Sequence, residues 1–131
     1  MNRVVVEWLE KAEGDYASAM RELRARNNPN DDSACFHAQQ CAEKYLRGLL
    51  QAWRVPFSKT HDLAALLDAC LCRHPEWESL RGGLKLLTQF AVAFRYPGES
   101  ATKEDAKHAV KVAVAVRDML RPLLHRKDST S

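Results

Sequence analysis

The sequence contains no long hydrophobic run and only a small excess of charge of one sign. No apolar stretch approaches the roughly 20 residues that a membrane-spanning helix needs, and Arg3–Val6 is followed at once by Glu7 instead of the apolar core of a signal peptide. We therefore expect a cytoplasmic protein with no membrane partner. The formal net charge of +3 is weak for an autonomous nucleic-acid binder, so charge alone indicates no partner.

Cysteines are few, and their positions argue against disulfides. The four cysteines lie inside helical patterns, where a free thiol behaves as a small hydrophobic group. The segment Cys70–His74 could suggest zinc, but structural zinc sites usually combine two pairs of ligands at short spacing. We predict no metal site and no cofactor.

The 46% hydrophobic and 28% charged composition is that of a globular chain. We predict one domain over residues 1–125 and a flexible tail over residues 126–131.

Apolar residues at helical spacing predict helices along the whole chain. A first helix ends near Asn27–Pro29, and a second follows the capping candidates Asp31–Ser33 and ends before Val55–Pro56. Thr60 is the predicted N-cap of a shorter third helix that ends at His74–Pro75. Each of these helices has a predicted inward face. The inward residues are Trp8, Ala12, Tyr16, Ala19 and Leu23 in the first helix, Ala34, Ala38, Cys41, Ala42, Tyr45, Leu49 and Trp53 in the second, and Leu63, Leu66, Leu67 and Cys70 in the third.

Two further helices complete the predicted fold. One covers residues 76–94, with a kink or break at Gly82–Gly83. The last begins at Thr102, which forms a capping box with Asp105. The alternating valines of residues 110–116 would also suit a strand. The apolar residues from Ala106 to Leu124 recur at helical spacing, however, over a span that is too long for a typical strand. The prediction is an all-α, antiparallel up-and-down bundle of about five helices, three of them long.

The most informative segment is residues 35–47, followed by residues 59–63. Hydrogen-bonding side chains crowd two turns of the second helix there, which is more than a packing helix requires. The residues concerned are His37, Gln39, Gln40, Glu43 and Lys44. This pattern indicates recognition as well as packing.

These segments resemble the HEPN domain family in its small prokaryotic branch. The resemblance rests on Trp8-x-x-Lys11-Ala12-x-x-Asp15, residues 35–47, Lys59-Thr60-His61-Asp62-Leu63 and Arg95-Tyr96-Pro97-Gly98. It implies a helical bundle that forms a homodimer. It also implies a minimal nucleotidyltransferase as partner, in a module of the toxin–antitoxin type.

Other members of the family are metal-independent ribonucleases, and the resemblance implies how to recognise them. Their signature is an Arg followed, after four to six residues, by a His, which suits acid–base chemistry on a ribose hydroxyl beside a phosphate. Arg95 precedes the last helix, but Ser100, Ala101 and Thr102 occupy the positions for the His. Arg54 and His61 have a fitting separation, but they straddle the loop between the second and third helices, whereas the family's motif lies beside the last helix.

The sequence therefore favours a binding module over an enzyme. We expect nucleotide or RNA contacts from one set of residues, arranged as a cleft with the second helix on one side and Arg95 on the other: His37, Gln40, Lys44, Lys59, His61, Arg95 and Tyr96. One alternative is a ribonuclease that uses Arg54 or Arg95 with His61. Another is a dimeric scaffold in which Trp53, Phe57 and Trp77 are exposed interface anchors.

Overall fold

The computed structural model describes the backbone of residues 2–130 and the side chains of residues 2–124. Its helices are α1 (Arg3–Arg24), α2 (Asp31–Ala52), α3 (Leu63–Asp68), a 3-10 helix (Pro75–Leu80), α4 (Arg81–Ala93) and α5 (Lys103–Thr130). No strand occurs within residues 2–130. The predicted all-α bundle with three long helices is confirmed. The predicted flexible tail, residues 126–131, lies outside the residues whose side chains are described.

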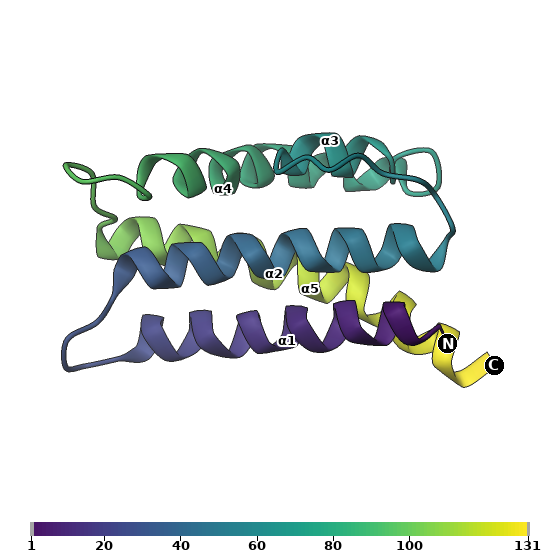
Figure 1. The fold of residues 1–131 in the computed structure, drawn as a ribbon, viewed down its shortest axis with the longest axis horizontal. Helices are drawn as coiled ribbons and strands as arrows, with labels where there is room; N and C mark the ends of the chain where they lie inside the picture. The colour runs from purple at the N-terminus through teal and green to yellow at the C-terminus, as the bar shows by residue number, and fades with distance from the viewer. Residues whose placement is uncertain (1, 131) are drawn as a thin grey trace.

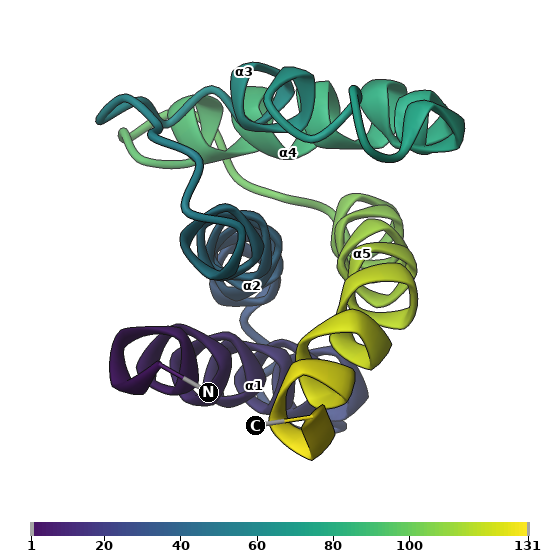
Figure 2. The same ribbon diagram turned by 90° about the vertical axis from the view of Figure 1, so that its right-hand side faces the viewer.

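Helix α2 is the centre of the molecule. Figures 1 and 2 show it between α1 on one side and the α3–α4 layer on the other, with α5 alongside. Thirteen of its 22 residues are buried, against four of 22 in α1. A helix covered on so many sides must satisfy its polar side chains internally, because water does not reach them.

The predicted capping of the last helix is confirmed, but the predicted N-caps of the second and third helices are wrong. Asn30, and not Asp31–Ser33, caps α2 by accepting from the backbone N–H of Ser33 at 2.9 Å. Thr102 and Asp105 form the predicted reciprocal capping box, with N···O distances of 3.0 and 3.1 Å. The predicted N-cap at Thr60 is wrong: Asp62 caps α3 by accepting from the backbone N–H of Ala64 at 3.0 Å. The hydroxyl of Thr60 instead accepts from the backbone of Asp62. Helix α3 also ends at Asp68, well before the predicted end at His74–Pro75.

The segment between α3 and α5 differs in detail from the prediction. Residues 76–94 do not form one helix, because a 3-10 helix precedes α4 and the change falls at Leu80–Arg81, just before Gly82. Trp77 is not an exposed anchor: it is 4% exposed and stacks on His74 at 4.1 Å between ring centroids. Trp53 and Phe57 are half-buried. The alternating valines of residues 110–116 lie within α5.

No helix in the described part of the chain is long and apolar enough to span a membrane.

Candidate functional site

The polar residues of α2 form two groups of contacts, and the first is centred on Asp15 of α1. Its carboxylate lies 2.8 Å from Nδ1 of His37 and 2.5 Å from Nζ of Lys44. Asp15 is 8% exposed, so its charge needs these two partners. His37 and Lys44 therefore join α1 to α2, and 28% and 22% of their side chains, respectively, remain exposed.

The second group is centred on Glu43 and is more deeply buried. Glu43 accepts from Gln39 Nε2 at 2.9 Å and from Arg47 Nε at 3.0 Å, and Gln40 donates to Gln39 at 2.8 Å. Glu43 and Arg47 are 8% and 7% exposed. Such a buried ion pair persists only when its remaining hydrogen-bonding groups also find partners.

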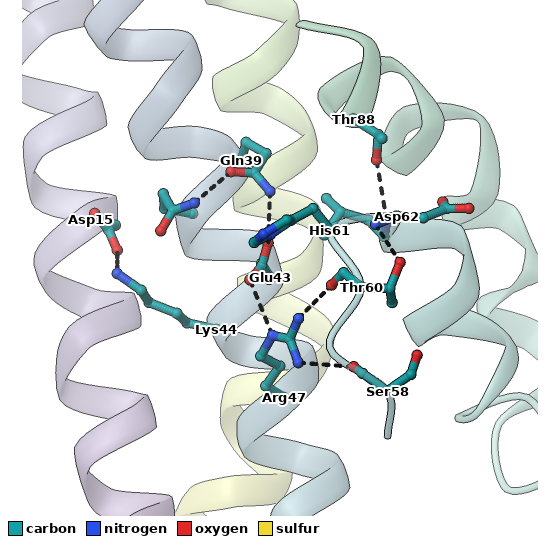
Figure 3. Close-up of polar contacts among 12 residues, drawn as sticks. Asp15, Gln39, Glu43, Lys44, Arg47, Ser58, Thr60, His61, Asp62 and Thr88 are labelled. Atoms are coloured by element: carbon teal, nitrogen blue, oxygen red, sulfur yellow. Dashed lines mark hydrogen bonds and ion pairs between the residues drawn. The ribbon is translucent and has the colours of Figure 1, made fainter. Parts of the chain in front are cut away.

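Those remaining partners come from the loop between α2 and α3. The guanidinium of Arg47 donates to the backbone carbonyls of Ser58, at 3.4 Å, and of Thr60. His61 places Nδ1 3.5 Å from Oε1 of Glu43, yet 83% of its side chain is exposed. Figure 3 shows His61 lying over Glu43, with Arg47 between that carboxylate and the loop. The loop thus presents an oriented imidazole to solvent.

The structure brings His61 to α2 but keeps Arg54 and Arg95 apart from it. Arg54 lies just beyond the end of α2, about 15 Å along the helix axis from Glu43. Arg95 lines a pocket with Cys35 and other residues near the start of α2, about 12 Å along the axis in the opposite direction. Among residues 2–124, no hydrogen bond or ion pair joins either arginine to His61.

The pocket beside Arg95 is mainly apolar. It is lined by Asp32, Cys35, Phe36, Phe90, Ala91, Phe94 and Arg95. Phe36 is 51% exposed, and Tyr96, next to Arg95 in sequence, is 62% exposed. The guanidinium and two exposed rings suit planar or anionic ligands. The predicted site residues therefore occupy two regions along α2, and not one cleft.

Sequence reasoning missed the residues that organise the site. Asp15 stands in the quoted pattern without a role, and Arg47 is only the last residue of the segment 35–47. Two signals were available: Asp15 lies one turn from inward Ala12 and Ala19, and Arg47 continues the i, i+4 series of Gln39 and Glu43. No sequence signal identified the carbonyls of the loop.

Metal binding finds no support in the described side chains. Within residues 2–124 there is no group of three or more His, Cys, Asp or Glu side chains that could hold a metal ion. Cys70 is buried and donates to the carbonyl of Leu66, whereas Cys72 is exposed.

The fold and the sequence both match one family. The HEPN domain model matches residues 5–123. The structure of ST0689, an archaeal HEPN homologue, is 24% identical with a TM-score of 0.74 and covers 95% of this chain and 99% of its own. TT1696 from Thermus thermophilus is 30% identical with a TM-score of 0.73, covering 93% and 98%. Among curated proteins, no sequence matches. Because the family model spans most of its length, the chain belongs to the HEPN domain family.

Proposed function

We propose that this protein is a homodimeric, non-catalytic HEPN module that binds a nucleotide or RNA and partners a minimal nucleotidyltransferase in a module of the toxin–antitoxin type. The observation that carries the binding role is the exposed pair Lys59 and His61. Both side chains face solvent, on a loop whose backbone is held by buried groups. A Lys ammonium and an imidazole at fixed positions suit the oxygens of a phosphate.

Binding is favoured over cleavage by the position of the arginines. A ribonuclease of this family needs an Arg beside its His, so that one stabilises phosphate charge while the other moves a proton. Arg95 and Arg54 lie toward opposite ends of α2, and Ser100, Ala101 and Thr102 offer no imidazole near Arg95. His61 can therefore contact a ligand without the partner that cleavage requires.

The two regions along α2 predict a difference between ligands. A mononucleotide that binds at Lys59 and His61 uses one region only. An RNA strand extends along the helix and also reaches Arg95 and Tyr96, where an exposed ring can stack on a base. Arg95→Ala is therefore expected to weaken RNA binding while leaving ATP binding unchanged.

Binding is tested by fluorescence anisotropy with a labelled oligoribonucleotide and by calorimetry with ATP. The double variant Lys59→Ala/His61→Ala should bind about tenfold more weakly or worse, since two charge-assisted contacts are lost. Lys85→Ala and Lys111→Ala remove exposed charges from α4 and α5 and should change affinity by less than about twofold. An unchanged affinity in the double variant would remove Lys59 and His61 from the proposed site.

The partnership is tested by co-expression with the product of the adjacent gene. A nucleotidyltransferase that co-purifies with the chain supports the proposal, and an unrelated neighbour that does not bind contradicts it. Dimerisation is tested by sedimentation of the wild type against Arg95→Ala/Tyr96→Ala. A wild-type monomer of 14.9 kDa would contradict the homodimer.

A ribonuclease is the second candidate, because Glu43 lies beside Nδ1 of His61 as an orienting carboxylate lies beside a catalytic base. This candidate predicts RNA cleavage without added metal. Cleavage should be lost in His61→Ala and in Arg54→Ala or Arg95→Ala, with the fold intact by circular dichroism. Undiminished cleavage by His61→Ala would exclude it.

A further inference from the structure

The loop that carries Lys59 and His61 is attached to α2 through one buried side chain, Arg47. Its two terminal nitrogens donate to the carbonyls of Ser58 and Thr60, the residues on either side of Lys59. The same guanidinium lies over the ring of Phe57, 5.1 Å from its centroid. Arg47 thus contacts the loop at three of the four residues around Lys59.

The third nitrogen of Arg47 links this contact to His61. Its Nε donates to Oε2 of Glu43 at 3.0 Å, and the other carboxylate oxygen, Oε1, lies 3.5 Å from Nδ1 of His61. Gln39 donates to the same oxygen, so the carboxylate cannot rotate freely. One buried chain of contacts therefore runs from the loop backbone through Arg47 and Glu43 to the imidazole (Figure 3).

The residues after His61 are held independently of Arg47. Asp62 caps α3, and the backbone N–H of Leu63 donates to the hydroxyl of Thr88 on α4 at 3.2 Å. Before the loop, the end of α2 is closed by backbone hydrogen bonds at Arg54 and Val55. The stretch that depends on Arg47 is accordingly residues 57–61, which contains the two exposed side chains of the proposed site, Lys59 and His61.

We propose that Arg47, together with Glu43, is a positioning residue for ligand binding. It does not touch the ligand; it fixes the backbone on both sides of Lys59 and orients His61, so that the ligand does not have to order the loop. This inference rests on the proposed function. A buried ion pair is seldom the most stabilising choice for a helix interior, where an apolar pair can pack as well. An apolar side chain, however, cannot donate to two loop carbonyls, and preorganisation of the loop favours binding.

Two variants separate positioning from folding. Arg47→Met leaves the charge of Glu43 buried without its partner, which can disturb α2. Glu43→Gln/Arg47→Met removes both charges while keeping similar volumes, and it should fold with native helicity by circular dichroism. Arg26→Met, which removes one exposed charge after α1, is the matched control for Arg47→Met, whereas the double variant leaves the net charge unchanged.

Backbone amide relaxation measured by NMR reports the order of the loop directly. In Glu43→Gln/Arg47→Met we expect the order parameters of residues 57–61 to fall to about 0.6 or less, while those of α1 and α5 are unchanged. Labelled RNA and ATP should each bind about tenfold more weakly, because the ligand must then order the loop. Arg26→Met should show neither effect.

A double-mutant cycle tests whether Arg47 acts through Lys59 and His61. In a Lys59→Ala/His61→Ala background, adding Glu43→Gln/Arg47→Met should weaken RNA binding by less than about twofold, because the groups that were positioned are gone. An equal loss in both backgrounds, or a loosened loop with unchanged affinity in the otherwise native chain, overturns the positioning role. Unchanged order parameters in residues 57–61 overturn the attachment itself. If instead Lys59→Ala/His61→Ala binds like the wild type, the proposed function fails, and the order parameters distinguish the two failures.

Discussion

Arg54 adopts a backbone conformation that favours glycine, with φ of 58°. It follows the C-cap of α2, and the backbone N–H groups of Arg54 and Val55 donate to the carbonyls of Gln51 and Leu50. This is the Schellman pattern that ends many helices, and its left-handed residue is usually glycine. This backbone role accounts for the turn at Arg54. It requires no catalytic function of the Arg54 side chain.

Replacement of Arg54 by glycine should therefore stabilise the protein. Arg54→Gly is expected to raise the free energy of unfolding by about 1 kcal/mol, because a Cβ disfavours the left-handed region. Urea denaturation measures the change. Arg54→Ala is the matched control, since it removes the guanidinium and keeps the Cβ. An equal gain in both variants would place the effect in the side chain and contradict this explanation.

The four cysteines differ sharply in exposure. Cys35, Cys41 and Cys70 are buried, and Cys72 is exposed. Burial, with smaller contributions from nearby acidic groups, raises the pKa of Cys35 and Cys41 to about 12, and burial raises that of Cys70 to about 12. Since the thiolate is the reactive form, these three thiols should be inert in the folded protein.

Thiol titration with Ellman's reagent tests this difference. The native protein should react rapidly at one thiol, and all four should react after unfolding in guanidinium chloride. Cys72→Ser should abolish the rapid reaction. A second rapid thiol in that variant would mean that α2 or the segment after α3 opens in the native state.

At the scale of elements, α4 and α5 cross closely at Gly83. A Cβ built on Gly83 would lie 2.8 Å from one methyl carbon of Val112 and 3.0 Å from the other, whereas one on Gly82 would meet nothing within 4 Å. Val112 is β-branched and cannot easily rotate away. The contact with Val112 therefore requires a glycine at position 83, whereas no neighbouring atom requires one at position 82.

Alanine substitutions at the two glycines should have opposite effects. Gly82→Ala should stabilise the protein by about 0.5–1 kcal/mol through helix propensity. Gly83→Ala should destabilise it by about 1–3 kcal/mol, because the added methyl forces α4 away from Val112. Thermal unfolding compares the pair, and each variant controls the other for propensity. Stabilisation by Gly83→Ala would contradict the close approach of α4 and α5.

At the scale of the whole molecule, Glu13 joins three long helices. It accepts hydrogen bonds from Arg117 of α5 at 2.8 and 2.9 Å and from the hydroxyl of Tyr45 of α2, and Arg121 lies 3.3 Å away. Burial raises the pKa of Glu13, but the hydrogen bonds from Arg117 and Tyr45 outweigh it. Its pKa therefore lies below the ordinary 4.5.

This lowered pKa makes stability depend on pH. Between 4.5 and the lower folded value, the unfolded chain binds a proton that the folded chain does not. The contribution of Glu13 is therefore fully present above that range and is lost as the pH falls through it. Glu13→Gln should lower the free energy of unfolding at neutral pH by about 1–3 kcal/mol and should flatten the dependence on the acid side.

Urea denaturation across the acid range measures both effects. Glu10→Gln changes an exposed carboxylate of the same helix and should leave the curve near that of the wild type. A Glu13→Gln variant with the same acid dependence as the wild type would show that other carboxylates control acid unfolding.

Local patterns in the sequence determined the long helices and the start of the last one. The capping box of Thr102 and Asp105 and the inward stripe of α2 depend on groups within four residues of each other, and a helix brings such groups together whatever surrounds it. The choice between Thr60 and Asp62 as a cap was not local in this sense. It depends on where the hydroxyl of Thr88 holds the backbone of Leu63.

The sequence by itself determined an all-α HEPN bundle and named His61, Lys59 and Arg95 as candidates. Only the tertiary structure decided that Asp15, Glu43 and Arg47 lie inside, that Trp77 is covered, and that Arg95 is remote from His61. The physical reason is that a polar side chain becomes buried when another segment covers its face of the helix. The contact between His61 and Glu43, 18 positions apart in the chain, exists only because the loop folds back over α2.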